Sequence, residues 1–142
     1  MMLGYKFFPH TADILFEAYG KTVEELFTNA ALAVEATMVD ITTVNEEKEF
    51  DIVIEEDDLE KLLYDFLSEL IFVKDTEGLL FMKFDITIVH EKKKLSLHAH
   101  CKGALIDREK QSLLDDTKAI TMHEFKVEQE DSVWTARVIV DV

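Results

Sequence analysis

The chain has 142 residues, 48% of them hydrophobic, with one proline and four glycines, and we expect residues 1–142 to fold as a single domain. Its net charge of −15 disfavours tight binding to nucleic-acid phosphates and favours cations or a basic partner, unless the charge serves solubility alone. One cysteine excludes an intrachain disulfide and is typical of a cytoplasmic protein, while a signal peptide and long apolar membrane spans are both missing from the sequence.

The first predicted elements are a strand and a helix joined at a glycine. Alternating residues predict a strand over 13–19, which Gly20 ends. Thr22 and Glu25 form a Ser/Thr-x-x-Glu capping box, in which each side chain can satisfy a backbone donor of the other residue. Helical spacing of apolar residues then predicts a helix that ends near Asp40.

The second predicted helix is the clearest element of the chain. It follows a short strand over 50–54, and Asp57 or Asp58 can cap its start. One apolar stripe, which we assign to the core, consists of Leu59, Leu62, Leu63, Phe66, Leu67, Leu70 and Ile71.

From Leu79 onward the apolar residues alternate with polar ones, as in strands that have one buried face. We expect strands over 84–89 and 95–100, joined by a turn at 91–94, and two more over 118–127 and 133–141. The pattern predicts an α+β fold: a two-layer sandwich of a largely antiparallel sheet with two helices packed on one face.

Acidic groups near the two ends of the sequence are the first candidate site. Pro9 stiffens the loop that carries His10 and Asp13, and Asp141 is followed directly by the α-carboxylate of Val142. Carboxylates held close together are stabilised by a proton or a cation, and oxygen ligands favour Ca²⁺, Mg²⁺ or Mn²⁺. Asp13 joins this group only if the first and last strands are neighbours; otherwise it caps a turn and Asp141 is solvated.

Two further polar groups have both a chemical and a structural interpretation. His98 and His100 share one strand face, which suits either a transition metal or a solvated surface, and Cys101 faces the opposite side as a small core residue. Lys118 opens a strand that also carries His123, and a strand lysine of this kind is ordinarily a surface charge.

Phosphate-binding loops, zinc-finger spacings and nucleophile elbows are missing from the sequence, which disfavours an autonomous enzyme.

Four segments together resemble the archease family, and their order and spacing cover essentially the whole chain. They are Pro9-His-Thr-Ala-Asp13, the helical segment from Leu62-Leu63 to Leu67-Ser-Glu-Leu-Ile-Phe72, Lys118-Ala-Ile-Thr-Met-His123, and Trp134-Thr-Ala-Arg-Val-Ile-Val-Asp-Val142. The resemblance implies an α/β domain related to strand-helix-strand-strand modules. It also implies an activator of the RtcB-type tRNA-splicing ligase, which promotes guanylylation of the ligase's active-site histidine and restores multiple turnover.

The resemblance also assigns roles to individual residues. It implies a divalent metal ion, first of all Ca²⁺, held by Asp13, Asp141 and the carboxylate of Val142. Lys118 matches a functionally important position of the family, and His10 and His123 match recurring polar positions that we expect to contact the partner.

This chain also departs from the family pattern at two positions. Many relatives carry Gly-Glu where it has Gly103-Ala104, and a histidine near the position of Gln111. If those residues normally touch the ligase or the metal, that contact is altered in this chain, although neither change removes an expected metal ligand.

Two alternative functions remain open from the sequence. One is a chaperone or adaptor for nucleic-acid-processing enzymes that acts through its acidic surface without a metal ion. The other is a small metal-dependent hydrolase that uses the same carboxylates, for which the chain alone should turn over nucleotides or phosphoesters. The expected partner in the favoured interpretation is the ligase itself, with no tight nucleic-acid binding and no membrane.

Overall fold

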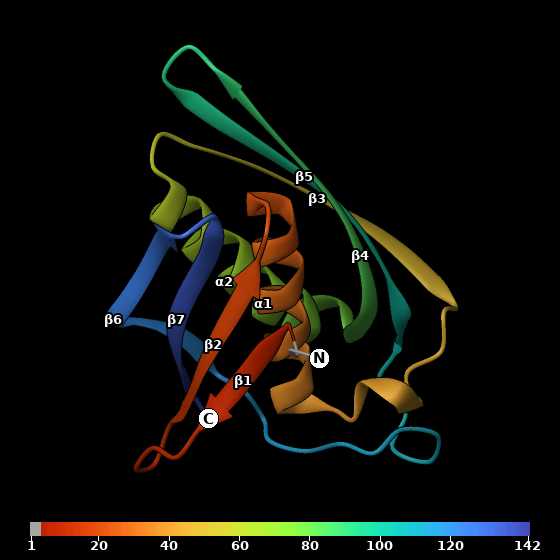
Figure 1. Ribbon diagram of the computed structural model, residues 1–142. Helices are drawn as coiled ribbons and strands as arrows, with labels where there is room; N and C mark the ends of the chain where they lie inside the picture. Colours follow the sequence, from red (N-terminus) through yellow and green to blue (C-terminus); the bar gives the residue numbers. More distant parts are fainter. Residues whose placement is uncertain (1–3) are drawn as a thin grey trace.

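Residues 4–142, described by a computed structural model, form two antiparallel sheets with two helices between them (Figure 1). The four-stranded sheet has the order β1-β2-β7-β6, with bounds β1 Tyr5–Phe8, β2 Ile14–Gly20, β7 Val133–Asp141 and β6 Ala119–Glu130. The three-stranded sheet has the order β3-β5-β4, with bounds β3 Lys48–Glu56, β5 Lys94–Leu105 and β4 Leu79–Glu91. The helices are α1 Val23–Met38 and α2 Leu59–Glu77, and a 3₁₀ turn, η1, covers Ile41–Thr43.

Each helix begins at a residue whose side chain caps it, and α2 also ends at a glycine cap. The Glu25 N–H donates to Thr22 Oγ1 (3.1 Å) at the start of α1, while the Glu25 carboxylate accepts from the N–H of Lys21 (3.2 Å). Asp58 caps α2 by accepting from the N–H of Glu60 (3.3 Å). Helix α2 ends at Gly78, whose φ of 66° lies in the left-handed region that glycine adopts at low cost.

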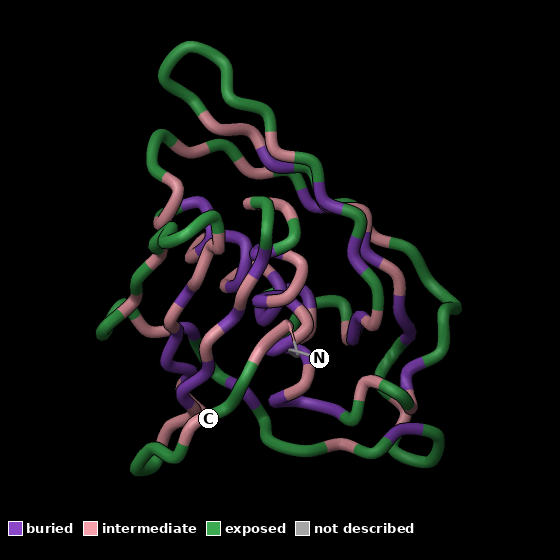
Figure 2. Tube along the Cα trace, viewed as in Figure 1, coloured by how far each residue is buried: buried purple, intermediate pink, exposed green. Residues whose placement is uncertain are grey.

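The apolar surface of α1 is wide because the helix packs against both sheets. It contacts β2 and β7 of one sheet and β4 of the other, and α2 contacts β6 as well as β3. Ala30, Ala31 and Ala33 are fully buried, and their small side chains let two layers approach the helix. One hydrophobic core therefore extends to both sides of the helical layer, and its buried residues lie along the helices and the strands of both sheets (Figure 2).

The predicted α+β class, with antiparallel strands and two helices, is confirmed, but the layers differ in one respect. The strands divide between two sheets, so the molecule has three layers with the helices in the middle rather than one sheet with helices on one face. Strand β1 and the turn η1 were not predicted, and the other elements agree with the predicted ones to within a few residues at most ends, with α2, β4 and β5 running longer. Among the described residues, no helix is both long and apolar enough to cross a membrane.

Candidate functional site at the joined strand ends

The pairing of β2 with β7 brings the two ends of the sequence together. The strands are antiparallel, and Ile14 lies opposite Val140. Asp13 directly precedes that pair on one strand, and Asp141 directly follows it on the other, so both carboxylates occur at the same end of the sheet. The sequence placed Asp13 beside Asp141 only if the strand after Asp13 and the last strand were neighbours, and β2 and β7 are neighbours.

The third strand of this sheet adds Lys118 to the same end. Ala119 of β6 lies opposite Asp141, and the N–H of Lys118 donates to the carbonyl oxygen of Asp141 (2.8 Å). The Lys118 side chain is exposed, as expected for a residue that contacts a partner or solvent. Val142 packs against the edge of the core, which holds the segment after Asp141 close to the sheet.

The loop that carries His10 and Asp13 has a strained backbone. Residues 9–13 connect β1 to β2, and Ala12 has a φ of 68°, in the left-handed region where a side chain costs on the order of 1 kcal/mol. Strain of this kind is found where a loop must hold a functional conformation. Pro9 fixes one further φ angle in this loop.

A hollow of about 500 Å³ lies beside this loop and contains His10 and Asp13. Its wall opposite the loop comes from Leu114 and Asp115, which are fastened to the end of α1. The Leu114 N–H donates to the carbonyl oxygen of Met38 (2.8 Å), and the Asp115 N–H donates to that of Thr37 (3.1 Å). Asp115 is thus a further acidic group of this site, and the acidic run that precedes Lys118 was the only signal for it in the sequence.

The donor set at the strand ends suits a hard cation. Asp13 and Asp141 supply carboxylate oxygens from neighbouring strands, and the third expected ligand, the carboxylate of Val142, is a main-chain group. No cluster of three His, Cys, Asp or Glu side chains within residues 4–142 is arranged to hold a metal ion. The carboxylates of Asp13 and Asp141 are oxygen donors of the kind that Ca²⁺, Mg²⁺ and Mn²⁺ prefer.

His123 lies apart from this group of residues. It is exposed on an irregular part of β6, where the pairing with β7 is interrupted between Thr121 and Lys126, and its Nε2 lies 3.8 Å from Glu124 Oε2. The structure thus brings Asp13, Asp141 and Lys118 to one end of the sheet, adds His10 through the shared hollow, and leaves His123 further along β6.

His98 and His100 form hydrogen bonds with acidic residues of β3 on the exposed face of the smaller sheet. Asp51 Oδ1 lies 3.0 Å from His98 Nε2 and 2.8 Å from His100 Nδ1, and Glu49 Oε1 lies 2.7 Å from His100 Nε2. The hydrogen bond with Asp51, and after it the one with Glu49, raises the pKa of His100. Cys101 is buried on the opposite face, as predicted, and burial raises the pKa of its thiol to about 12.

Glu35 is a buried acid that the sequence did not reveal. It lies in α1 with no exposed surface, and its Oε1 accepts from the N–H of Phe81 (2.9 Å), where β4 has an irregularity. Its Oε2 has no hydrogen-bond partner within the described chain, and burial raises the pKa of this carboxyl to about 8.

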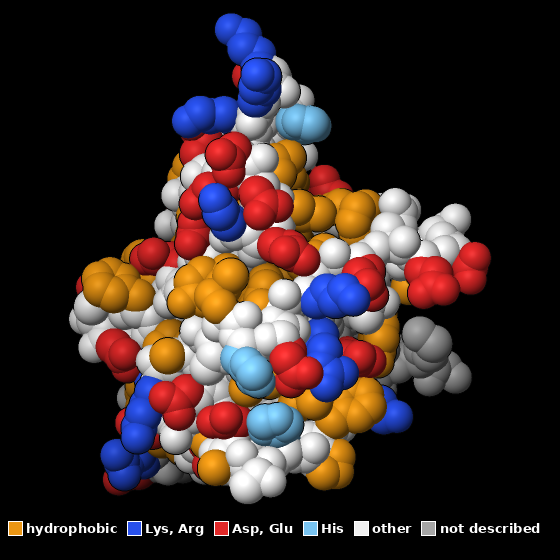
Figure 3. All heavy atoms as spheres, turned by 90° about the vertical axis from the view of Figure 1, so that its left-hand side faces the viewer, with side chains coloured by type: hydrophobic (Ala, Val, Ile, Leu, Met, Phe, Trp, Pro, Cys, Tyr) orange, Lys and Arg blue, Asp and Glu red, His pale blue; other side chains and the backbone are white. Residues whose placement is uncertain are grey.

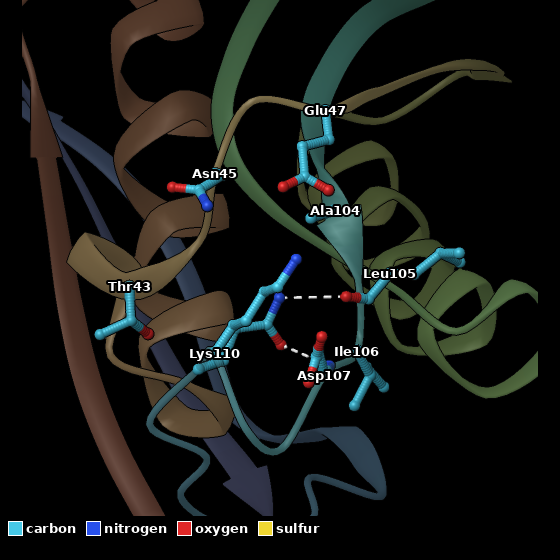
Figure 4. Close-up of a pocket in the computed structure, with 9 residues that line it drawn as sticks. Thr43, Asn45, Glu47, Ala104, Leu105, Ile106, Asp107 and Lys110 are labelled. Atoms are coloured by element: carbon cyan, nitrogen blue, oxygen red, sulfur yellow. Dashed lines mark hydrogen bonds between the residues drawn. The ribbon is translucent and has the colours of Figure 1, made fainter.

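The two departures from the family pattern line a single hollow of about 290 Å³ (Figure 4). Ala104 of β5 lines the hollow, and Gln111 forms two hydrogen bonds with the segment that follows Ala104. Gln111 Nε2 donates to the carbonyl oxygen of Leu105 (3.0 Å), and the Asp107 N–H donates to Gln111 Oε1 (2.9 Å). Gln111 therefore holds the loop after β5, and Figure 4 shows Lys110 extending into the hollow.

Comparisons with known proteins agree over nearly the whole chain. The family model described as "Archease protein family (MTH1598/TM1083)" matches residues 5–142. The chain is 38% identical to the protein archease of Pyrococcus furiosus over 142 residues, 99% of this chain and 100% of that one. It is 41% identical to the protein archease of Methanothermobacter thermautotrophicus over 141 residues, again 99% of this chain and 100% of the relative.

Two solved structures share the fold. The solution structure of Methanobacterium thermoautotrophicum protein 1598 has a TM-score of 0.89 and 41% identity, covering 99% of this chain and 100% of that one. The crystal structure of a Thermotoga maritima archease, described as a possible chaperone, has a TM-score of 0.63 and covers 96% of both chains. At 22% identity the second likeness shows the fold alone.

Proposed function

The chain belongs to the archease family, and we propose that it is an accessory activator of an RtcB-type tRNA-splicing RNA ligase rather than an enzyme itself. In this proposal it promotes guanylylation of the ligase and allows the ligase to turn over repeatedly. A cytoplasmic location goes with the proposal. The net charge of −15 supports a basic protein surface as the binding partner and disfavours direct, tight binding to RNA.

The observation that carries the proposal is the pairing of β2 with β7, which sets Asp13 and Asp141 at the same end of the sheet. Asp13, Asp141 and the carboxylate of Val142 would hold a divalent ion, first of all Ca²⁺, with Mg²⁺ or Mn²⁺ as alternatives. Such an ion, when bound, supplies positive charge that stabilises phosphate oxygens during nucleotidyl transfer.

The remaining residues act on the partner. Lys118, exposed beside Asp141, would bind a phosphate or a carboxylate of the ligase, where an ammonium group forms charge-assisted hydrogen bonds. His10, in the hollow that also contains Asp13, and His123, further along β6, would add polar contacts.

The test is to incubate a cognate RtcB-type ligase with GTP and Mn²⁺, with and without a substoichiometric amount of this protein. Guanylylated ligase and ligated RNA are followed over time. We expect faster guanylylation and repeated turnover with the wild-type chain, and loss of both with Asp13→Ala. Asp85→Ala, which removes an exposed carboxylate from β4, is the matched control and should behave as wild type. A cognate ligase that responds equally to buffer and to this protein would refute the proposal.

A second candidate is a metal-independent chaperone or adaptor, which the net charge of −15 favours. Under that function Asp13→Asn would be harmless, and salt would weaken binding of the partner because it screens exposed charges. The same assay, run with Asp13→Asn at two ionic strengths, separates the two functions.

A further inference from the structure

A groove runs along the outward side of α2, between the edge strands of the two sheets. It consists of two hollows that meet at Ser68 and Phe72: one of about 410 Å³ with Asp65 and Glu69, and one of about 220 Å³ that reaches Lys118. Ile54 of β3 bounds the first hollow, and Ile120 of β6 bounds the second. We call these two hollows together the α2 groove.

Phe72 is the apolar centre of this groove. Phe72 is 59% exposed, and it lines both hollows. Figure 3 shows the face of the molecule that carries α2 and β6, where hydrophobic side chains gather at mid-height on the left and in the centre, with acidic and some basic side chains above and below them. A large exposed apolar group with a polar rim is the usual composition of a protein-binding surface.

The acidic end of the groove favours a cation. The pKa of Asp65 is raised, mainly by burial and next by the neighbouring carboxylate of Glu56. Negative charge is therefore already crowded at this end. Glu69 adds another carboxylate to the same hollow. A basic side chain in the hollow would relieve this repulsion, and it could also stack on the ring of Phe72.

The other end of the groove leads to the candidate site. Lys118 lines the second hollow, and its main-chain N–H is bonded to Asp141, a proposed metal ligand. A protein segment that lay in the groove would therefore run toward the joined strand ends. A nucleic acid fits less well, because its phosphates would face Asp65, Glu69 and Asp75.

We propose that the α2 groove docks a basic segment of the partner protein, with an apolar side chain against Phe72 and a Lys or Arg side chain between Asp65 and Glu69. This inference rests on the proposed function, since it takes the ligase as the partner. It adds a docking surface at the α2 groove to the contacts assigned to Lys118, His10 and His123, and it leaves activation to the residues at the strand ends.

The test measures the affinity of the cognate ligase for Phe72→Ser and Glu69→Lys by calorimetry, and measures ligase guanylylation with the same proteins. Both residues are at least partly exposed, so both variants should fold. We expect binding to weaken at least tenfold in each, whereas guanylylation at saturating variant should return to the wild-type rate. Val53→Ser, at a residue 75% exposed on β3, and Glu91→Lys, at the β4–β5 hairpin, are the matched controls and should bind as wild type.

The possible failures are distinguishable. Wild-type protein that stimulates the ligase, together with unchanged affinity in both groove variants or equal weakening in the controls, would overturn the docking inference alone. Wild-type protein that neither binds nor stimulates the ligase would overturn the proposed function and the inference with it. A dimer of the chain alone, detected by sedimentation and lost in Phe72→Ser, would assign the groove to a second copy instead.

Discussion

Replacing Glu35 by Gln should change how the stability of this protein depends on pH. In the folded chain, burial raises the pKa of Glu35 from 4.5 to about 8, so the folded state keeps a proton that the unfolded state loses near pH 4.5. The free energy of unfolding therefore falls as pH rises through this window, by about 1.4 kcal/mol per pH unit from this residue, and the decline ends above the folded-state pKa. The whole contribution is on the order of 5 kcal/mol.

Glu35→Gln removes this titration but keeps an oxygen that can accept from the N–H of Phe81. The new amide N–H₂ takes the place of a protonated carboxyl oxygen that likewise has no partner among the described residues. The two proteins should therefore have similar stabilities near pH 5. Relative to wild type, it should gain about 1.4 kcal/mol with each further pH unit up to about pH 8.

Urea denaturation of both proteins at several pH values between 5 and 9 measures this difference directly. Using the difference cancels the titration of the other carboxylates, which the two chains share. Glu46→Gln, at an exposed position, is the matched control and should follow wild type at every pH. A stability difference between Glu35→Gln and wild type that stayed constant from pH 5 to pH 8 would refute the reasoning.

Three further predictions concern the backbone, the histidine pair and the metal. Gly103→Ala should destabilise the protein by about 1–3 kcal/mol in thermal or urea denaturation, because the added methyl group would collide with a main-chain carbonyl of β4. Asp51→Asn should lower the pKa of His100 in an NMR titration, since Asp51 is the main cause of its elevation; an unchanged pKa would show that Glu49 alone sets it. Ca²⁺ at a hundred times its dissociation constant should add about 3 kcal/mol to the free energy of unfolding, measured with EDTA as the blank. This gain should disappear in Asp13→Ala, and an equal gain in that variant would exclude Asp13 as a ligand.

Much of the fold could be predicted because its signals are local. The Thr22 cap, the apolar stripe of α2 and the alternation after Leu79 each need only a few neighbouring residues, and the structure has an element at each place. Strand β1 was missed because Tyr5–Phe8 is four residues long and shows no clear alternation. The division into two sheets was missed because a strand pattern shows that one face is buried but not which layer buries it.

The candidate site depended on contacts that local patterns do not contain. The link between Asp13 and Asp141 required the pairing of strands from opposite ends of the sequence, so it could be stated only as a condition. Glu35 could not be found, because a glutamate in a helix is ordinarily solvated. Its carboxylate is buried where it accepts a hydrogen bond from the N–H of Phe81 in β4, and only the folded chain brings these two residues together.

The position of the two strand-end carboxylates is fixed by the hydrophobic core rather than by the loops around them. Phe16 and Ala18 of β2 and Ala136 and Val138 of β7 are fully buried, and their register pairs Phe16 with Val138 and Ala18 with Ala136. A slip of one residue would turn these side chains out of the core, so that register is strongly disfavoured. The same register places Asp13 at the end of β2 beside the end of β7. A site built this way gains its precision from buried strands, and Pro9 and the left-handed Ala12 restrict the loop that carries Asp13.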